Sequence, residues 1–150
     1  MLEFITELPA NQKIGGVHCV PVLNNGNIVM VWDREEKVLT TIGGRLVEGE
    51  SIMDGLNREV MEEAGLVLTE EKMLFASWYW KEFDAYRLYY LVKVKEFVEI
   101  PDGFETTGYV ITNFKTAIDM IKTIEGREER IEVIRRAGIM SGQLIEEERR

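Results

Sequence analysis

The stretch Gly44-Arg45-Leu46-Val47-Glu48-Gly49-Glu50, followed after seven residues by Arg58-Glu59-Val60-Met61-Glu62-Glu63-Ala64-Gly65-Leu66, is the most informative part of this 150-residue chain. It follows the pattern G-x5-E-x7-R-E-U-x-E-E-x-G-U, in which U is an apolar residue, and every fixed position is filled. Chance would fill the seven glycine, arginine and glutamate positions from one starting point with a frequency of roughly 10⁻⁸ to 10⁻⁹. The stretch therefore indicates a site with a defined chemistry.

The second half of this stretch predicts a helix over residues 52–64. Ser51 is a good N-cap residue, Asp54 follows it three positions later, and apolar residues recur at four-residue spacing on one face. Gly65 is a typical residue for the C-terminal end of a helix. The apolar face is expected to pack on a sheet, which leaves the acidic face outside.

The acidic face of this helix predicts a metal site. Glu59, Glu62 and Glu63 stand at positions i, i+3 and i+4, so their side chains project together, and like charges at these spacings repel by roughly 0.2 to 0.5 kcal/mol per pair. A divalent cation would reverse the sign of this energy, and carboxylate oxygens are the ligands that Mg²⁺ prefers. For a glutamate-rich helix taken alone, a solvated acidic face would be the more common interpretation.

The whole pattern resembles the signature of the Nudix hydrolases, the MutT-like hydrolases of nucleoside diphosphates linked to another moiety. The resemblance implies an α/β (α+β) fold, an α/β/α sandwich with a mixed β-sheet, and a pyrophosphohydrolase that depends on Mg²⁺ or Mn²⁺. The order of expected strands and helices favours the same layered arrangement.

Carried over residue by residue, the resemblance implies that Arg58 and Glu50 form an ion pair that orients the metal-binding helix on its loop. The water-activating base varies among these enzymes. Glu59 is the default within the pattern, Glu105 in a later loop is the alternative, and a solvated loop acid is an equally weighted interpretation of Glu105. The catalytic candidates are Glu59, Glu62 and Glu105, and the metal-binding candidates are Gly44 (through its carbonyl oxygen), Glu59, Glu62 and Glu63.

Composition favours a single globular domain over residues 1–150, because 45% of the residues are hydrophobic and the length suits one core. The single cysteine, Cys19, lies in an apolar run and is expected in the core. The sequence has no basic, apolar leader and no apolar stretch long enough to cross a membrane, so a cytoplasmic protein is expected.

The net charge of −9 opposes binding to the backbone of nucleic-acid polymers. A small nucleotide remains a suitable partner, because bound metal ions invert the local field of an acidic site. A homodimer is compatible with this fold, although the sequence does not indicate which surface would be shared.

The remaining elements are expected from apolar runs, turn residues and helical spacing. Residues 16–23 and 28–32 form a hairpin, and Gly126 and Gly138 are expected to break the C-terminal helices. The further strands are expected at residues 39–42, 74–81, 86–94 and 108–113, and the C-terminal helices at residues 116–124 and 127–137.

Residues outside the pattern are expected to decide the substrate. Aromatic side chains can stack on a nucleobase, and alternation along a strand places Trp78 and Trp80 on one face. Filling of a sheet core is the commoner role of such aromatic residues, and a hydrogen-bonded histidine inside a sheet is the commoner role of His18. The substrate-binding candidates are His18, Arg45, Trp78, Trp80 and Asn113.

The first choice of substrate is a nucleoside triphosphate with a purine or oxidised purine base, hydrolysed to the nucleoside monophosphate and pyrophosphate. ADP-ribose, nucleotide sugars and dinucleoside polyphosphates are the alternatives. The chain has Glu82 where the resemblance to ADP-ribose hydrolases would place a proline. A regulator that binds nucleotides without hydrolysing them is the alternative from another class, and its usual sign would be loss of the pattern's glutamates.

Overall fold

Three long strands, β2 (Ile14–Val22), β6 (Leu66–Trp80) and β7 (Ala85–Phe97), form the centre of the sheet in the computed structural model, which describes residues 1–103 and 108–146. Strands β6 and β7 pair antiparallel, and β2 pairs with β7 in parallel, so the sheet is mixed. The main path is β1-β6-β7-β2-β3-β4, while β5 pairs with β2 and β8 pairs with β3. The shorter strands are β1 (Leu2–Phe4), β3 (Ile28–Asp33), β4 (Val38–Thr40), β5 (Ile42–Arg45) and β8 (Tyr109–Thr112).

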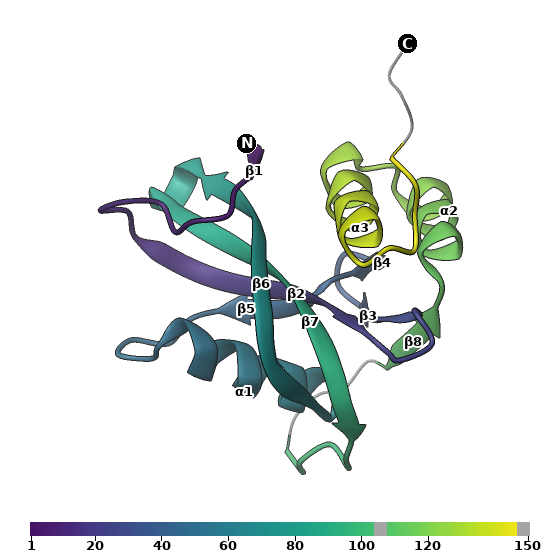
Figure 1. Ribbon diagram of the computed structural model, residues 1–150. Helices are drawn as coiled ribbons and strands as arrows, with labels where there is room; N and C mark the ends of the chain where they lie inside the picture. Colours follow the sequence, from purple (N-terminus) through teal and green to yellow (C-terminus); the bar gives the residue numbers. More distant parts are fainter. Residues whose placement is uncertain (104–107, 147–150) are drawn as a thin grey trace.

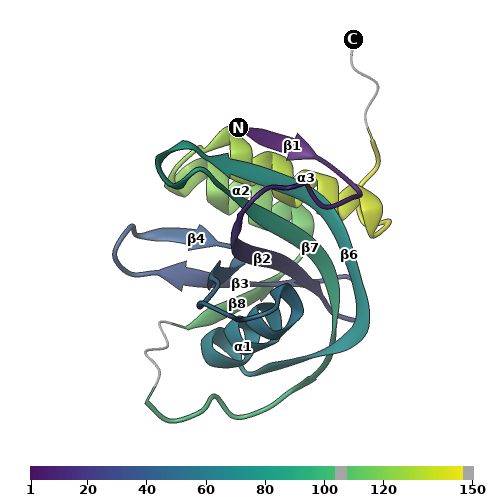
Figure 2. The same cartoon turned by 90° about the vertical axis from the view of Figure 1, so that its left-hand side faces the viewer.

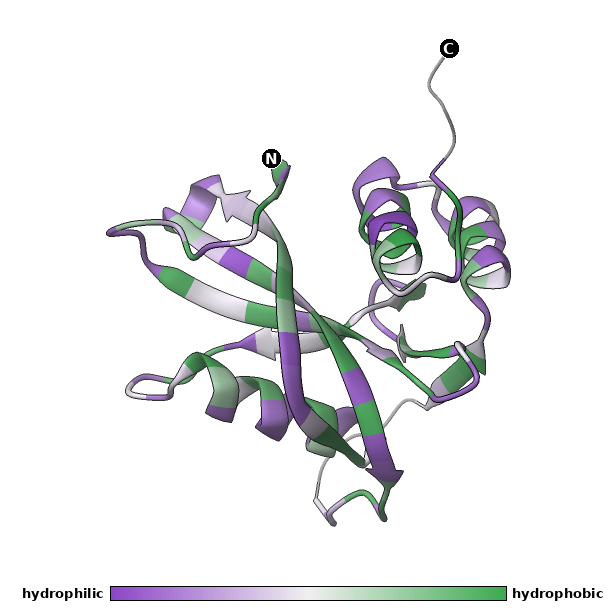
Figure 3. Cartoon of the chain, viewed as in Figure 1, coloured by the Kyte–Doolittle hydropathy of each residue, from purple (hydrophilic) through white to green (hydrophobic). Residues whose placement is uncertain are grey.

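Helices cover both faces of this sheet (Figures 1 and 2). Helix α1 (Ile52–Ala64) buries Leu56 and Val60 in one apolar cluster, together with side chains from β2, β3 and β7. Helices α2 (Phe114–Ile124) and α3 (Glu128–Met140) close a second cluster against Phe75 and Met30. Figure 3 shows hydrophilic colouring on the side of α1 that faces away from the sheet. The α/β/α arrangement with a mixed sheet is confirmed.

Helix α1 has the bounds that its sequence predicts, and the expected hairpin of β2 and β3 forms with Val22 opposite Ile28. The expected strand at residues 39–42 is divided into β4 and β5, because β4 pairs with β3 whereas β5 crosses to β2. Within the described residues, no helix is long and apolar enough to cross a membrane.

Several boundaries differ from those expected. Strand β6 begins at Leu66, directly after α1, because its first residues pair with the end of β7. Gly138 does not break the last helix, which continues to Met140. A Cβ atom at Gly138 would lie 2.5 Å from Cδ1 of Leu144, so this glycine allows the C-terminal segment to pack on α3.

Candidate metal centre

Local capping fixes where α1 begins and ends, and so which way its acidic face points. The hydroxyl of Ser51 accepts a hydrogen bond from the Asp54 amide at 3.1 Å, as the N-cap position requires. Gly65 ends the helix in the left-handed region with φ of 62°, and its amide donates to carbonyls of the last turn. Both ends of the helix that carries the glutamates are therefore defined by the chain itself.

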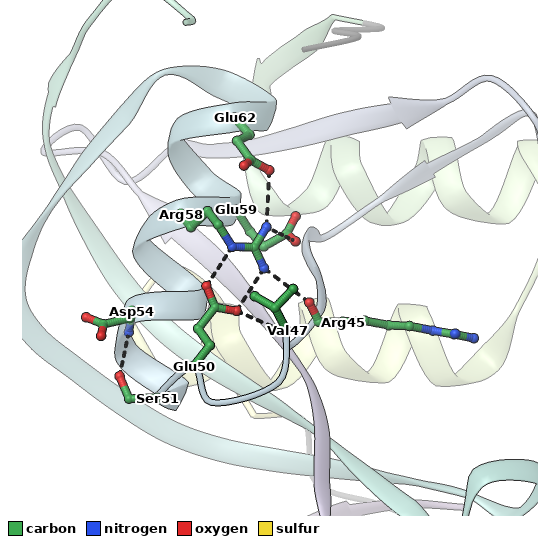
Figure 4. Close-up of polar contacts among 8 residues, drawn as sticks. All are labelled: Arg45, Val47, Glu50, Ser51, Asp54, Arg58, Glu59 and Glu62. Carbon is green, nitrogen blue, oxygen red and sulfur yellow. Dashed lines mark hydrogen bonds and ion pairs between the residues drawn. The ribbon is translucent and has the colours of Figure 1, made fainter. Parts of the chain in front are cut away.

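Arg58 lies at the centre of the acidic cluster, as Figure 4 shows. Its Nε donates to Glu50 Oε2 at 2.6 Å and its Nη2 donates to Glu50 Oε1 at 3.0 Å, which makes the pair bidentate. The Nη1 atom donates to Glu59 at 2.9 Å and to Glu62 at 3.2 Å. The Nη2 atom also donates to the carbonyl oxygen of Arg45 at 3.2 Å. One guanidinium therefore holds the loop, the preceding strand and two helical carboxylates.

Glu50 is the loop's anchor to this guanidinium. Its hydrogen bonds with Arg58 and with the Val47 amide, which lies 3.0 Å away, hold the pKa of its carboxyl below the usual range. Gly55 on α1 lies against the same loop, and a Cβ atom there would lie 2.3 Å from Leu46 and 3.1 Å from Glu50. The sequence pattern does not mark Gly55, although a glycine on the inner side of the helix is what lets the loop approach it.

The other two carboxylates lie closer to the sheet. Glu63 Oε2 accepts a hydrogen bond from the Gly43 amide at 2.9 Å. Burial and the neighbouring charge of Glu59 raise the pKa of Glu63 to about 8. Burial also raises the pKa of Glu59. A Cβ atom at Gly44 would lie 2.6 Å from Oε1 of Glu59, so this glycine leaves room for the carboxylate beside the strand.

This donor set suits a hard divalent cation. Three partly buried carboxylates crowd against a main-chain segment, and Arg58 is the cation that contacts two of them. Within the described residues, no three His, Cys, Asp or Glu side chains converge on one point as ligands of a single ion. Because Mg²⁺ is commonly held by one or two carboxylates with water and substrate phosphate completing its shell, the residues fit this ion without such convergence.

The structure brings the metal-binding candidates together beside the acidic face of α1. It does not bring all of the other candidates to the same place. Glu105 lies outside the described residues. Asn113 caps α2, where its Oδ1 accepts a hydrogen bond from the Thr116 amide at 2.8 Å, so this oxygen is already occupied. His18 is buried, and its Nδ1 lies 2.8 Å from the hydroxyl of Thr41, as in a hydrogen-bonded sheet histidine.

The two aromatic candidates, Trp78 and Trp80, have different surroundings. Trp78 is partly buried and packs against the apolar cluster beneath α2 and α3. Trp80 contacts two guanidinium groups, with Arg45 at 5.2 Å and Arg87 at 4.7 Å from its ring centre. The Arg45 side chain points away from the carboxylates (Figure 4). Sequence reasoning did not mark Arg87, because its place beside Trp80 depends on the pairing of β6 with β7.

Comparison with known proteins identifies the family of the chain. The model of the family described as "NUDIX domain" matches residues 13–136, which include the whole signature stretch. A search of curated proteins finds no match to the chain.

Solved structures show the same fold. A NUDIX hydrolase from Nitrosomonas europaea superposes with a TM-score of 0.63 at 20% identity, covering 87% of this chain and 91% of its own. A structure described as an ADP compounds hydrolase has a TM-score of 0.65 at 16% identity, and the match covers 91% of this chain and 77% of that chain. An Ap4A hydrolase from C. elegans has a TM-score of 0.60 at 15% identity, and the match covers 85% of this chain and 98% of that chain. At these identities the likeness concerns the fold.

Proposed function

The chain belongs to the NUDIX domain family and is a pyrophosphohydrolase, and from this premise we propose that it hydrolyses a pyrophosphate bond in a nucleoside diphosphate linked to another moiety, with Mg²⁺ or Mn²⁺ as cofactor. Our first choice of substrate is a nucleoside triphosphate, which would give the nucleoside monophosphate and pyrophosphate. The base would be a purine or an oxidised purine.

One observation carries the proposal. Arg58 gathers Glu50, Glu59 and Glu62 within 2.6 to 3.2 Å, and Glu63 lies beside Glu59 against the Gly43 amide. A stability role would not require so many partly buried carboxylates on one side of a helix, because they repel one another. A site for a cation and a phosphate group accounts for the arrangement.

The residues would divide the chemistry as follows. The carbonyl oxygen of Gly44 and the carboxylates of Glu59, Glu62 and Glu63 would hold the divalent cation. When bound, such an ion neutralises phosphate oxygens and lowers the pKa of the attacking water. Arg58 would keep the carboxylates in place through its bonds to Glu59 and Glu62.

A carboxylate must also take the proton from the attacking water. Glu59 is our choice, because it is the default base within the family pattern, and burial raises the pKa of its carboxyl, which favours uptake of a proton. Glu105 is the alternative that the resemblance supplies.

The experiment is a metal-dependent hydrolysis assay on a panel of substrates. Nucleoside triphosphates, oxidised guanine nucleotides, ADP-ribose, nucleotide sugars and dinucleoside polyphosphates would be incubated with the chain and Mg²⁺ or Mn²⁺, and the products separated. We expect turnover by the wild-type chain and its loss in Glu62→Gln. Glu71→Gln is the matched control, because Glu71 is exposed and pairs with Lys93 on the surface.

The outcomes separate the candidates. Turnover lost in Glu62→Gln and kept in Glu71→Gln supports the hydrolase and selects its substrate class. Nucleotide binding without turnover across the panel would instead favour the regulator that binds nucleotides. Equal turnover by wild type and Glu62→Gln would contradict the assignment of the acidic cluster.

A further inference from the structure

Two arginines stand on either side of a glycine in one row across the sheet. Arg45 of β5 pairs with Gly16 of β2, and Gly16 pairs with Arg87 of β7. Residues paired in this way point to the same face, and neighbouring strands lie about 4.8 Å apart. The two arginine backbones are therefore roughly 10 Å apart, and no side chain projects from the strand between them.

The same two arginines meet at one indole ring. The guanidinium carbon of Arg45 lies 5.2 Å from the ring centre of Trp80, and that of Arg87 lies 4.7 Å from it. Arg45 also lies 4.6 Å from the ring centre of Phe83, which itself packs edge-on against Trp80. Trp80 thus contacts both positive groups, and Phe83 contacts that of Arg45.

Neither arginine takes part in an ion pair among the described residues, in a chain with 27 acidic and 18 basic residues. Among the residues that the structure describes, the Arg87 side chain donates a hydrogen bond to the Tyr89 hydroxyl at 3.5 Å. The positive charge of Arg87, after burial, lowers the pKa of His18 on the neighbouring strand. Because no carboxylate in the described part of the chain pairs with either arginine, both charges are available to an external anion.

A pocket of about 580 Å³ opens at this place beside the loop that carries Glu50. Lys13, Arg45, Trp80 and Phe83 line it, so Lys13 is a second positive group beside Arg45 in this pocket, and Arg87 lies against the lining residue Trp80. Glu48 and Glu50 also border the pocket. The charge of Glu50 is already compensated by Arg58, at 2.6 Å.

We propose that Arg45 and Arg87 form a phosphate-binding subsite for the outer phosphates of an oligophosphate substrate, with Trp80 and Phe83 holding the two guanidinium groups in position. This inference rests on the proposed function, since the main chain of Arg45 is bonded to Arg58 in the candidate metal centre. A guanidinium presents paired N–H groups that match phosphate oxygens, and an anion between two of them removes their mutual repulsion. The subsite favours substrates whose phosphate chain extends beyond the bond that is broken.

The test measures binding of inorganic tripolyphosphate by calorimetry, in EDTA and without divalent metal, so that the acidic cluster contributes no attraction. We expect the wild-type chain to bind, and Arg45→Gln and Arg87→Gln each to weaken binding about tenfold. Arg45→Lys and Arg87→Lys keep the charge and lose the paired donors. Their affinities for tripolyphosphate should lie between those of the wild-type chain and the corresponding glutamine variants. Thermal unfolding of each variant checks that the chain is folded.

Arg136→Gln is the matched control. Its guanidinium also lies over an aromatic ring, 4.2 Å from the centre of Phe4, but it belongs to α3 and faces neither the loop nor Trp80. Tripolyphosphate should bind this variant as it binds wild type. Absence of binding by wild type, or wild-type affinity in both Arg45→Gln and Arg87→Gln, overturns the subsite.

The two proposals fail separately. If Glu62→Gln abolishes turnover while Arg45→Gln and Arg87→Gln bind tripolyphosphate as wild type does, the subsite is wrong and the proposed function stands. If tripolyphosphate binding follows the two arginines while Glu62→Gln keeps full turnover, the subsite stands and the proposed metal centre is wrong.

Discussion

Arg58 shows how much one side chain can organise. Its guanidinium donates to Glu50, Glu59, Glu62 and the Arg45 carbonyl, with distances from 2.6 to 3.2 Å. The hydrogen bonds and charges of Glu50 and Glu59, chiefly the hydrogen bond with Glu50, raise the pKa of a group that is already charged at its usual value. A planar group with five donors is needed to serve so many acceptors at once.

Arg58→Lys should therefore lower activity although the charge is kept. A single ammonium cannot bond Glu50 through two atoms and also reach the helical carboxylates. Loss of such an orienting group typically lowers metal affinity or activity about 10- to 100-fold. Turnover and the Mg²⁺ concentration for half-maximal activity would be measured beside Arg127→Lys, a change at a half-exposed arginine. Equal effects of the two substitutions would show that Arg58 has no special role.

His18 makes stability depend on pH. Burial lowers its pKa well below the usual value, and the charges of Arg87 and Arg130 lower it further. The unfolded chain binds a proton at this histidine below about pH 6.5. The native chain does not, so the stability that neutral His18 contributes is complete above pH 6.5 and falls as the pH decreases, by up to about 1.4 kcal/mol per pH unit.

Urea unfolding at pH 7.5, 6.5 and 5.5 would measure this dependence. The wild-type chain should lose more stability on acidification than His18→Asn, which keeps a polar group near Thr41 without a titrating ring. Parallel pH profiles for the two chains would contradict the assignment.

At the scale of elements, the C-terminal end of α1 joins the helix that carries the acidic cluster to the sheet. The Gly65 amide donates to the last turn of the helix, and the Gly65 carbonyl accepts from the Val98 amide at 2.7 Å. Its φ of 62° lies in the region that glycine adopts most easily. Strand β6 starts at the next residue, so this turn sets how α1 lies on the sheet.

Gly65→Ala should be strongly destabilising. The Cβ atom would lie 2.2 Å from the Val98 carbonyl oxygen in addition to the cost of the backbone conformation. We expect a loss of about 3 kcal/mol or more in the free energy of unfolding. Gly142→Ala isolates the backbone cost, because Gly142 has φ of 79° with no atom within 4 Å of its Cβ position, and it should lose about 1 to 2 kcal/mol. Similar losses of unfolding free energy in Gly65→Ala and Gly142→Ala would contradict the steric argument.

At the scale of the whole molecule, the opposite charges of the candidate sites belong to different structural units. The carboxylates come from one helix, whereas Arg45 and Arg87 come from two strands separated by β2. Sheet pairing thus places positive groups beside the loop that holds the acidic cluster, in a chain whose net charge is −9. A metal ion and a phosphate chain can be held together at this junction.

Binding of Mg²⁺ should stabilise the fold as a whole. A ligand that binds the native chain at 100 times its Kd adds about 2.7 kcal/mol. For a chain of this size that raises Tm by about 5 to 10 °C. Thermal unfolding in EDTA and in MgCl₂ would show this rise for wild type and Glu71→Gln, and a smaller rise for Glu63→Gln. A rise of the same size in all three would place the metal elsewhere.

Much of the fold could be predicted because it is local. Helix α1, its caps and the hairpin of β2 and β3 follow from neighbouring residues. The early start of β6 could not, because it depends on pairing with the distant end of β7. The course of α3 through Gly138 could not either, because it depends on how the following segment at Leu144 folds back onto the helix.

The sequence by itself determined the acidic cluster, since residues at helical spacings face the same way whatever surrounds the helix. It also determined the Arg58–Glu50 pair, through the family pattern that both residues occupy. Tertiary structure alone decided that Thr41 is the partner of the buried His18, and that Arg45, Gly16 and Arg87 share a row. The physical reason is that alternation along a strand predicts which residues share a face, whereas the pairing of β5 and β7 with β2 joins segments distant in the sequence, which no local pattern specifies.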